Sequence, residues 1–544
     1  MSRSRLLELL DRPFAGLAAC LLFGGLVSLA KGVDANWDLA NYHFYNPWAW
    51  LHGRLAFDYA PAQLQSYNSP FLDLPFYALV RAGVPAAGVA FVMGAPFGIA
   101  VHLFYRVARA VVADLGIGRP ELALAAIGLV GLTGAAGLSQ VGSTMNEWST
   151  TVFVVAGLAL LVAAVRRAGP ASVGLCAGAG LLAGIAVGLK LTAAVSAVAL
   201  FGAAAACLGR RPRALGALLA MAVAGAAGFV VAYGYWAWVL WERFANPFFP
   251  YFNDLFRSEY WEPVAFRSDT FRPRKLNHWL TLPFKLAERN QLVGEAEMRD
   301  PRLAFLVVIA LALAASLLAR ARRERRPLAA LVRERMPASV SFLALFAALS
   351  YVLWLVLFTI YRYVIPMELV ASLLLVVALR AAFAGGVHRD ALTAVFVGFV
   401  VVATYVPYWG RTPLHFGPAV QASVPPVPRD ALVMIFTQAP LGYVVPFIGS
   451  GARVIRPASN FTGPAFDNRL QREMAALVAA QRGPMFVLRR SDEADPGEEA
   501  MLVRYGLRRH DDGCRPFRAS FDERLALCPL ARTAPPRGPN APIE

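Results

Sequence analysis

Long apolar runs without a single charged side chain recur along this chain, and they restrict its fold more than any other feature. Two of them are residues 303–318 and 391–405. About 20 such residues are enough for a helix to cross the hydrocarbon core of a bilayer. The composition agrees, because 58% of the residues are hydrophobic and only 16% are charged, whereas about 25% are charged in an average globular domain. The chain is therefore predicted to be an all-α polytopic membrane protein.

The apolar runs predict about eleven transmembrane helices. Each run lies between loops that contain charged, aromatic or turn-forming residues. The predicted helices cover residues 14–31, 85–106, 121–138, 149–165, 171–189, 191–208, 214–240, 302–320, 338–358, 364–383 and 391–409.

The cations predict the orientation of these helices. A net charge of +17 could suggest a nucleic-acid partner, but in a membrane protein Lys and Arg collect in cytoplasmic loops. Arg3, Arg5 and Arg12 precede the first apolar run, which has no clear cleavage site, so this run is expected to remain as an anchor with a cytoplasmic N-terminus. Alternate loops then carry the Arg clusters, the densest at 320–335. An odd number of spans places the C-terminal tail outside, and no nucleic-acid partner is expected.

This topology predicts three parts. A transmembrane module covers residues 1–410, with long outer loops at 32–84 and 241–301. A Pro-rich connector leads into an extracytoplasmic α/β tail domain at 411–532, in which 431–436, 453–456 and 485–488 are predicted as strands and 468–480 as a helix. Residues 533–544 are predicted to be disordered.

Cysteine usage adds one open question. Three of the five cysteines lie in apolar spans, where a buried thiol is ordinary. Cys514 and Cys528 stand in the polar tail. If the tail is extracytoplasmic these two could form a disulfide, and the sequence leaves both the bonded and the reduced pair open.

The segment directly after the first predicted helix, residues 34–47, gathers carboxylates, amides and aromatic rings. Asp34 and Asp38 are four residues apart, so on a helix they would share one face and could form a site for a base or a cation. Asn41, Tyr42 and His43 add hydrogen-bonding groups beside them. The alternative is that either aspartate only caps an interfacial helix, because Asp is a favoured N-cap residue.

Three further segments carry motifs. They read His-Gly-Arg-Leu-Ala-Phe-Asp-Tyr at 52–59, Gly-Ile-Ala-Val-Gly-Leu-Lys-Leu-Thr at 184–192 and Asn-Pro-Phe-Phe-Pro-Tyr-Phe-Asn at 246–253. In this order, and with Asp38 after the first helix, they resemble the GT-C superfamily of polytopic glycosyltransferases. Those enzymes take a sugar from a polyprenyl-phosphate carrier at the outer face of the membrane. The resemblance extends over the whole membrane part of the chain.

The resemblance implies roles for single residues. Asp38 is the expected base for the acceptor hydroxyl, with Asp34 as second choice, and Glu147 matches an acidic residue that some members carry in the second outer loop. A carboxylate can take the acceptor proton while the bond from C1 to phosphate breaks. Outward-facing cations are expected to hold the phosphate, and the candidates are Lys190 and Arg362. Tyr361, next to Arg362, and the trio Asn41, Tyr42 and His43 are also expected to bind substrate.

Each of these roles has a plainer alternative. Lys190 and Arg362 could extend to lipid headgroups, and Glu147 could be an ordinary acid at a helix start. The group from Arg267 to Lys285 is read as a general patch for anionic headgroups. No metal site is predicted, because the histidines lack a ligand spacing. No cofactor is assigned with certainty, and a divalent cation is left open because Trp37-Asp38-Leu39 stands where some family members have paired acids.

The sequence thus predicts a membrane glycosyltransferase of the GT-C type, a hexosyl- or pentosyltransferase that inverts the anomeric centre. Its partners would be a polyprenyl-phosphate-linked sugar, an extracytoplasmic glycan, lipid or protein acceptor, and membrane lipids. The expected location is a bacterial inner membrane, in cell-envelope glycan biosynthesis. Two alternatives are a transporter or flippase of lipid-linked saccharide, which would need charges inside the helix bundle, and a non-catalytic assembly protein on the same fold.

Overall fold

The computed structural model describes residues 8–266, 270–383, 387–491 and 496–533. Two compact units emerge. The first consists of Met1–Lys31, Phe91–Gly234 and Ser268–Trp409, and the second of Gly32–Ala90, Tyr235–Arg267 and Gly410–Glu544. Arg267 and the predicted disordered end beyond residue 533 lie outside the described residues. The division into a membrane module at 1–410 and a tail domain at 411–532 stays a prediction.

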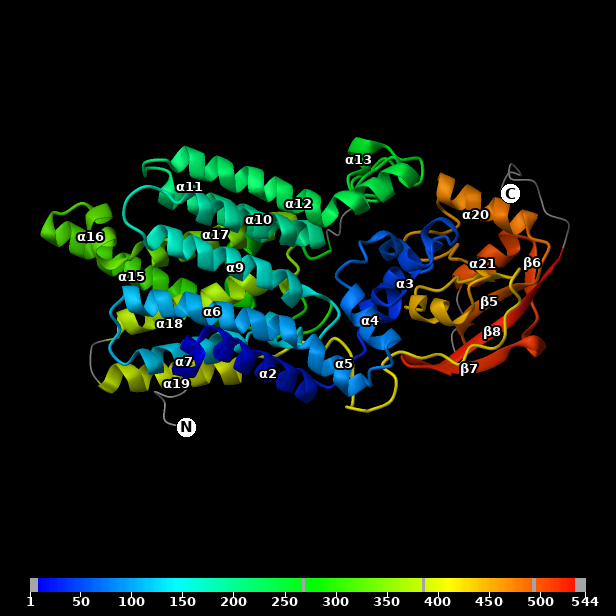
Figure 1. Ribbon diagram of the computed structural model, residues 1–544, viewed down its shortest axis with the longest axis horizontal. Helices are drawn as coiled ribbons and strands as arrows, with labels where there is room; N and C mark the ends of the chain where they lie inside the picture. The colour runs from blue at the N-terminus through cyan, green and yellow to red at the C-terminus, as the bar shows by residue number, and fades with distance from the viewer. Residues whose placement is uncertain (1–7, 267–269, 384–386, 492–495, 534–544) are drawn as a thin grey trace. The chain divides into compact units, whose positions relative to one another are not determined.

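Helices make up the first unit almost entirely (Figure 1). Each of the eleven predicted spans coincides with a described helix, and eight described helices are long and apolar enough to cross a membrane. The all-α polytopic fold is therefore confirmed, while the number of spans stays a prediction. The helices are α2 (Pro13–Lys31), α6 (Ala95–Asp114), α7 (Pro120–Leu132), α8 (Ala135–Ser139), α9 (Glu147–Arg166), α10 (Val173–Leu189), α11 (Ala194–Leu208), α14 (Leu276–Lys285), α15 (Arg302–Glu324), α16 (Leu328–Arg335), α17 (Ala338–Leu357), α18 (Ile365–Ala382) and α19 (Val387–Ala403), while α5 (Ala86–Met93) and α12 (Ala214–Phe244) belong partly to each unit.

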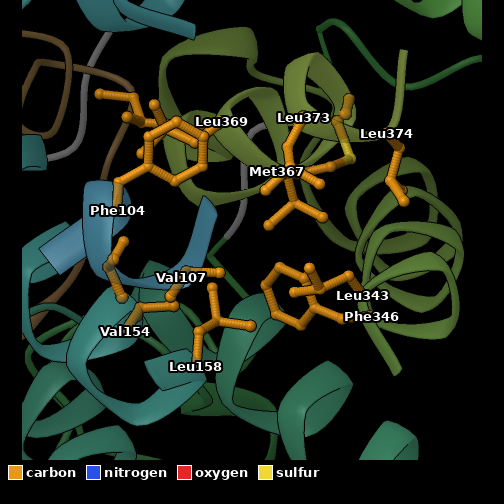
Figure 2. Close-up of a cluster of buried hydrophobic side chains, with 14 of the residues drawn as sticks. Phe104, Val107, Val154, Leu158, Leu343, Phe346, Met367, Leu369, Leu373 and Leu374 are labelled. Carbon is orange, nitrogen blue, oxygen red and sulfur yellow. The ribbon is translucent and has the colours of Figure 1, made fainter. Parts of the chain in front are cut away.

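Helix α18 forms the centre of the first unit. In the candidate span Tyr361–Ala382, 83% of the residues in its most apolar stretch are buried, whereas in α15 only 11% are. A helix that is apolar on all sides is typically buried on all sides. Figure 2 shows the packing, in which Met367, Leu369, Leu373 and Leu374 of α18 lie with side chains from α6, α9 and α17. This helix begins directly after the turn that carries Arg362.

Two predicted spans end earlier than expected. The span at 121–138 breaks after Leu132 and resumes as the short helix α8. The break is explained by the backbone N–H groups of Ala135 and Ala136, which donate to side-chain carboxylates and so cannot continue α7. The last span ends at Ala403, because Tyr405 pairs with Arg299 as an isolated β-bridge.

The second unit contains a six-stranded sheet with the order β4-β3-β5-β8-β6, and β7 also pairs with β8. Strand β3 is parallel to β4 and β5, and the remaining pairs are antiparallel. The strands are β3 (Leu432–Met434), β4 (Arg453–Ile455), β5 (Met485–Arg490), β6 (Leu507–Arg509), β7 (Arg515–Ala519) and β8 (Asp522–Arg532), with helices α20 (Arg469–Ala480) and α21 (Pro496–Arg504).

The three predicted tail strands and the predicted tail helix are all present. The small α/β C-terminal fold is therefore confirmed. Strands β6, β7 and β8 were not predicted. Strand β8 is the longest of the sheet, but its apolar and polar residues alternate poorly, which gives no clear strand pattern. Cys514 and Cys528 form a disulfide, which settles the pairing that the sequence left open.

The remaining elements of the second unit come from the two long loops and the connector. A two-stranded sheet pairs β1 (Val33–Asp34) with β2 (Arg411–Thr412). The first loop then continues through the π-helix η1 (Leu39–His43), α3 (Tyr45–Leu51), the 3-10 turns η2 (Arg54–Ala56) and η3 (Gln63–Tyr67), and α4 (Leu74–Arg81). In the second long loop, α13 (Asn253–Phe256) follows α12, and the tail contains the 3-10 turn η6 (Gly442–Phe447).

A buried ion pair joins the first long loop to the tail sheet. Asp58 Oδ1 lies 2.7 Å from Arg54 Nη2, with both side chains almost fully buried. The same carboxylate accepts from the backbone N–H of Val454 on β4 at 2.9 Å, and Arg54 donates to the carbonyls of Ser450 and Ala452 at 2.7 and 2.6 Å. Burial raises the pKa of Asp58, and the guanidinium of Arg54 opposes this rise. The motif at 52–59 therefore serves as a structural joint within this unit.

A second joint within this unit is centred on a carboxylate of helix α20. Glu473 on α20 accepts from the hydroxyls of Tyr59 and Tyr260, both at 3.0 Å, and from Arg469 Nε at 2.8 Å. Burial raises the pKa of Glu473, but the hydrogen bonds from Arg469 and the two tyrosines outweigh it and hold the pKa below its usual value.

We predict that the Glu473 joint weakens in acid. A carboxyl with a lowered pKa in the folded state contributes stability above its unfolded pKa of about 4.3, and this contribution is lost as the pH falls through the folded pKa. The side chain is 28% exposed, so the effect is about 1 kcal/mol at most. The protection factors of the α20 amides, which are corrected for the intrinsic exchange rate at each pH, should fall below pH 4 in the wild type. In Glu473→Gln they should already be lower at pH 7 and should change less with acid. An identical pH response in both proteins would contradict this.

Candidate functional site

Lys190 and Glu147, which were predicted from two different loops, form an ion pair in the first unit. Glu147 is the first residue of α9 and is 5% exposed, while Lys190 directly follows α10 and is 23% exposed. The Lys190 ammonium also donates to the carbonyl oxygen of Met145 at 2.8 Å. Lys190 is therefore held by protein atoms at a helix end.

Arg362 also contacts Met145, from a different element of the fold. It lies in the 3-10 turn η5 (Tyr361–Val364), and its Nη1 is 3.3 Å from Met145 Sδ. Its guanidinium lies 5.4 Å from the ring centroid of Tyr363 and 5.6 Å from that of Trp409. Lys190 also lies 5.5 Å from the Tyr363 ring. Both cations thus converge on Met145 and Tyr363, and we call Lys190, Glu147 and Arg362 the cation cluster.

Two small cavities meet at Arg362. The first is lined mainly by hydroxyl and charged side chains, and the second mainly by apolar and aromatic ones. An anion with a polar side and an apolar side would suit a cation in this position, because the guanidinium offers planar paired donors to phosphate or carboxylate oxygens. The first cavity is lined by Glu147, Thr150, Thr151, Val154, Thr192, Ala193, Ser196, Arg362, Tyr363, Ile365 and Pro366, and the second by Ala136, Ser139, Val293, Gly294, Ala296, Met298, Ile360, Tyr361, Arg362, Pro407 and Trp409.

Tyr361, predicted to bind substrate, is 4% exposed and contributes to the wall of the second cavity. Its backbone N–H donates to the carbonyl of Val293 at 2.7 Å. Its ring meets Trp354 edge-on, with 6.2 Å between centroids. These contacts fix the turn from which Arg362 projects, and the binding role of Tyr361 stays a prediction.

In the second unit, Asp38 immediately precedes the π-helix η1 and is half-buried. Among the described residues, the cap bond to this helix comes from Asn36 Oδ1, which accepts from the backbone N–H of Leu39 at 2.8 Å, and not from Asp38. The interpretation of Asp38 as a helix cap is therefore wrong. π-Helical turns are rare and occur frequently at functional sites.

Asp34 has a different position from the one expected. It lies in strand β1, where it is 7% exposed, and both of its oxygens accept from Asn36 Nδ2 at 2.9 and 2.8 Å. Asp34 and Asp38 therefore do not share a helix face. The reason is that the chain leaves α2 at Lys31 and is extended by its pairing with β2. Asn36, which was not predicted, holds the Asp34 carboxylate and accepts from the backbone N–H of Leu39 in the helix that follows Asp38.

The three neighbouring candidates for substrate binding are buried to different degrees. Asn41 is fully buried and donates to the carbonyl of Ala62 at 3.1 Å. His43 is 4% exposed, and its Nδ1 lies 2.7 Å from Asp73 Oδ1. Tyr42 is half-buried, with its ring centroid 4.0 Å from that of His43. Asn41 and His43 thus brace the loop, and their direct contact with a substrate stays a prediction.

Metal binding has no support from clustering. Within the described residues, no group of three or more His, Cys, Asp or Glu side chains is arranged to hold a metal ion. In the described part of the outer cation group, from Arg272 to Lys285, Lys285 is the last residue of helix α14 and the other cations precede this helix.

The sequence prediction missed a buried charge network in the first unit, formed by Asp300, Arg302 and Glu368. Asp300 Oδ1 lies 2.9 Å from Arg302 Nη1, and these two side chains are 0% and 1% exposed. Burial would raise the pKa of Asp300, but Arg302 and the backbone N–H donors hold it below its usual value. Glu368 is 2% exposed. The sequence did contain a signal for Glu368, because it is an ionisable residue inside the predicted span 364–383.

Comparison with solved structures gives one informative likeness. No family model matches the sequence, and no curated protein matches it. ArnT from Cupriavidus metallidurans, in a structure bound to undecaprenyl phosphate, aligns over 94% of this chain and 97% of ArnT, with a TM-score of 0.51 and 13% identity. The chain shares the fold of this ArnT structure. The apo structure of the same ArnT aligns over the same shares, with a TM-score of 0.49 and 13% identity.

The fold shared with ArnT confirms the polytopic helical architecture with a C-terminal α/β part that was predicted from the sequence. The likeness covers almost the full length of both chains, so the membrane helices and the C-terminal sheet both belong to it. At 13% identity it concerns the arrangement of the backbone. The roles of Asp38, Glu147, Lys190 and Arg362 depend on the geometry described above.

Proposed function

We propose that this protein is a membrane glycosyltransferase that moves a hexosyl or pentosyl unit from a polyprenyl-phosphate carrier to an extracytoplasmic glycan, lipid or protein acceptor. The observation that carries the proposal is the cation cluster, in which Arg362 separates a hydroxyl-lined cavity from an apolar one. A carrier of this kind has the same division, with a sugar on one side of a phosphate and a hydrocarbon chain on the other. The fold shared with ArnT supports it, because that ArnT structure contains undecaprenyl phosphate.

The chemistry is a single inverting displacement. An acceptor hydroxyl attacks C1 of the sugar, the bond from C1 to the phosphate oxygen breaks, and the phosphate leaves with the bonding electrons. Arg362 and Lys190 would compensate its charge, with Glu147 holding Lys190 in place. Asp38 would take the hydroxyl proton. We further propose a bacterial inner membrane location with a cytoplasmic N-terminus and a periplasmic tail, which the Cys514–Cys528 disulfide supports because disulfides persist in oxidising compartments.

The transporter alternative is weaker. It needs ionisable groups along a path through the bundle. Two of the buried charges of the first unit, Arg302 and Glu368, are instead occupied by Asp300 and by backbone and hydroxyl partners.

We predict that the cation cluster binds the carrier phosphate. Purified wild-type protein should bind undecaprenyl phosphate, and Arg362→Ala should weaken binding about 10-fold or more, because a hydrogen bond to a charged group is worth roughly 1.5–3 kcal/mol. Lys190→Ala should act in the same direction. Binding can be measured by native mass spectrometry or intrinsic tryptophan quenching.

Two controls make this test specific. Arg322→Ala removes an exposed cation from the densest Arg cluster and should leave the affinity unchanged. Undecaprenol has the same chain without phosphate and should bind weakly to every variant. Equal binding of the alcohol and the phosphate, or an unaltered affinity in Arg362→Ala, would contradict the proposed role of the cluster.

A further inference from the structure

The carboxylate of Glu368 is the N-terminal anchor of the short helix α8. Its Oε2 accepts from the backbone N–H of Ala136 at 2.9 Å, and its Oε1 accepts from that of Gly137 at 2.8 Å. A negative charge at a helix N-terminus is stabilised by the free N–H groups there. The Trp148 indole N–H donates to the carbonyl of Gly137 at 2.9 Å. Helix α8 is therefore fixed by side chains from α18 and α9.

Asp300 and Arg302 complete the anchor. Asp300 Oδ2 accepts from the backbone N–H of Ala135 at 3.1 Å, so all three of the first N–H groups of α8 are occupied. Arg302 donates from Nε and Nη2 to the carbonyl of Val130, at 3.0 and 2.9 Å, and also to the hydroxyls of Thr133 and Thr404. The network thus joins the ends of α7, α8, α15 and α19 with the beginning of α18.

The anchored segments are those that carry the cation cluster. After α8 the chain continues through a short loop to Met145, which contacts both cations, and to Glu147. On the other side, Glu368 lies in the first turn of α18, directly after the turn that carries Arg362. One carboxylate therefore links the segment that holds Lys190 with the segment that presents Arg362.

Buried ionic groups are costly to desolvate, and apolar residues of similar volume often stabilise a fold as well or better. A network of this kind is consequently not explained by stability alone. Its hydrogen bonds are directional, so it restricts geometry where an apolar contact would allow sliding.

We infer that Glu368, supported by Asp300 and Arg302, is a positioning residue that sets the spacing between Arg362 and the Lys190–Glu147 pair and thereby determines affinity for the carrier phosphate. This inference rests on the proposed function. Glu368 would not contact the carrier, because its two oxygens are taken by α8.

A glycine pair offers a matched steric test. A Cβ on Gly134 would lie 1.9 Å from Glu368 Oε1, whereas among the described residues a Cβ on Gly128 of α7 would meet open space for 4 Å. Gly134→Ala should therefore displace the carboxylate and weaken binding of undecaprenyl phosphate about 10-fold, and Gly128→Ala should bind like the wild type. Equal affinities in the two folded variants would overturn the inference.

A double-variant cycle separates positioning from general structural damage. Glu368→Gln keeps the volume but turns one acceptor into a donor that faces a backbone N–H, so it should weaken undecaprenyl phosphate binding about 10-fold. In the Arg362→Ala background the same change should have little further effect, because the cation that it positions is gone. An equal loss in both backgrounds, or none in either, would overturn the inference and leave the proposed function standing. If the wild type itself fails to bind undecaprenyl phosphate, the proposed function falls and this inference falls with it.

Discussion

Asp38→Asn is expected to lower sugar transfer at least about 100-fold, because general base catalysis typically contributes 10²- to 10⁴-fold. The amide has nearly the same shape as the carboxylate and keeps a carbonyl oxygen, but it cannot take a proton from the acceptor hydroxyl. Asp38 is half-buried at the start of a π-helix whose cap bond is made by Asn36. The substitution should therefore leave η1 intact and remove only the base.

The measurement is the amount of glycan and of lipid-linked sugar in the producing cells when Asp38→Asn replaces the wild type at equal membrane abundance. A matched control is Asp467→Asn, which changes a tail carboxylate that is 86% exposed and should leave the product unchanged. Undiminished product in Asp38→Asn would move the base to Asp34 or Glu147. If those variants are also silent, the chain is a transporter or an assembly protein.

Asp58→Ala is expected to destabilise the second unit by about 3–5 kcal/mol, which is the usual cost of removing one partner of a buried ion pair. Arg54 would be left buried with its charge uncompensated, and the N–H of Val454 on β4 would lose its acceptor. The loss should concentrate in β4 and in the loop from Arg54 to Tyr59, whose carbonyl accepts from the N–H of Arg456.

Hydrogen exchange resolved by peptide is the suitable measurement, because a chain with two units need not unfold in a single step. Exchange of β4 amides should accelerate strongly in Asp58→Ala, while the amides of α18 in the first unit should be unaffected. Arg515→Ala, at an exposed arginine of β7, is the control and should behave like the wild type. Unchanged protection of β4 in Asp58→Ala would show that the pair does not hold the loop to the sheet.

The sequence predicted the fold well where one physical signal dominates. Each apolar run bounded by charged loops coincides with a described helix, because a span must be apolar over its whole length. The ends of several of these helices differ from the prediction. The first three tail strands and helix α20 were also found, since buried parallel strands read as short apolar runs and α20 has a clear amphipathic pattern. The unpredicted strands β6 to β8 are held by pairing with distant segments, which a local pattern does not report.

For the candidate site as well, the sequence predicted some features and only the tertiary structure decided the others. Residue type and membrane sidedness were enough to select Lys190, Glu147 and Arg362, because isolated charges at helix ends are visible in the sequence. The convergence of Lys190 and Arg362 on Met145 is tertiary, because these contacts join residues 45 and 217 positions apart along the chain. The extended conformation of Asp34 depends likewise on pairing with β2, nearly 380 residues away. The anchoring of α8 by Glu368 depends on packing too, because only the folded bundle brings a carboxylate from α18 to the free N–H groups of a helix that lies more than 200 residues earlier.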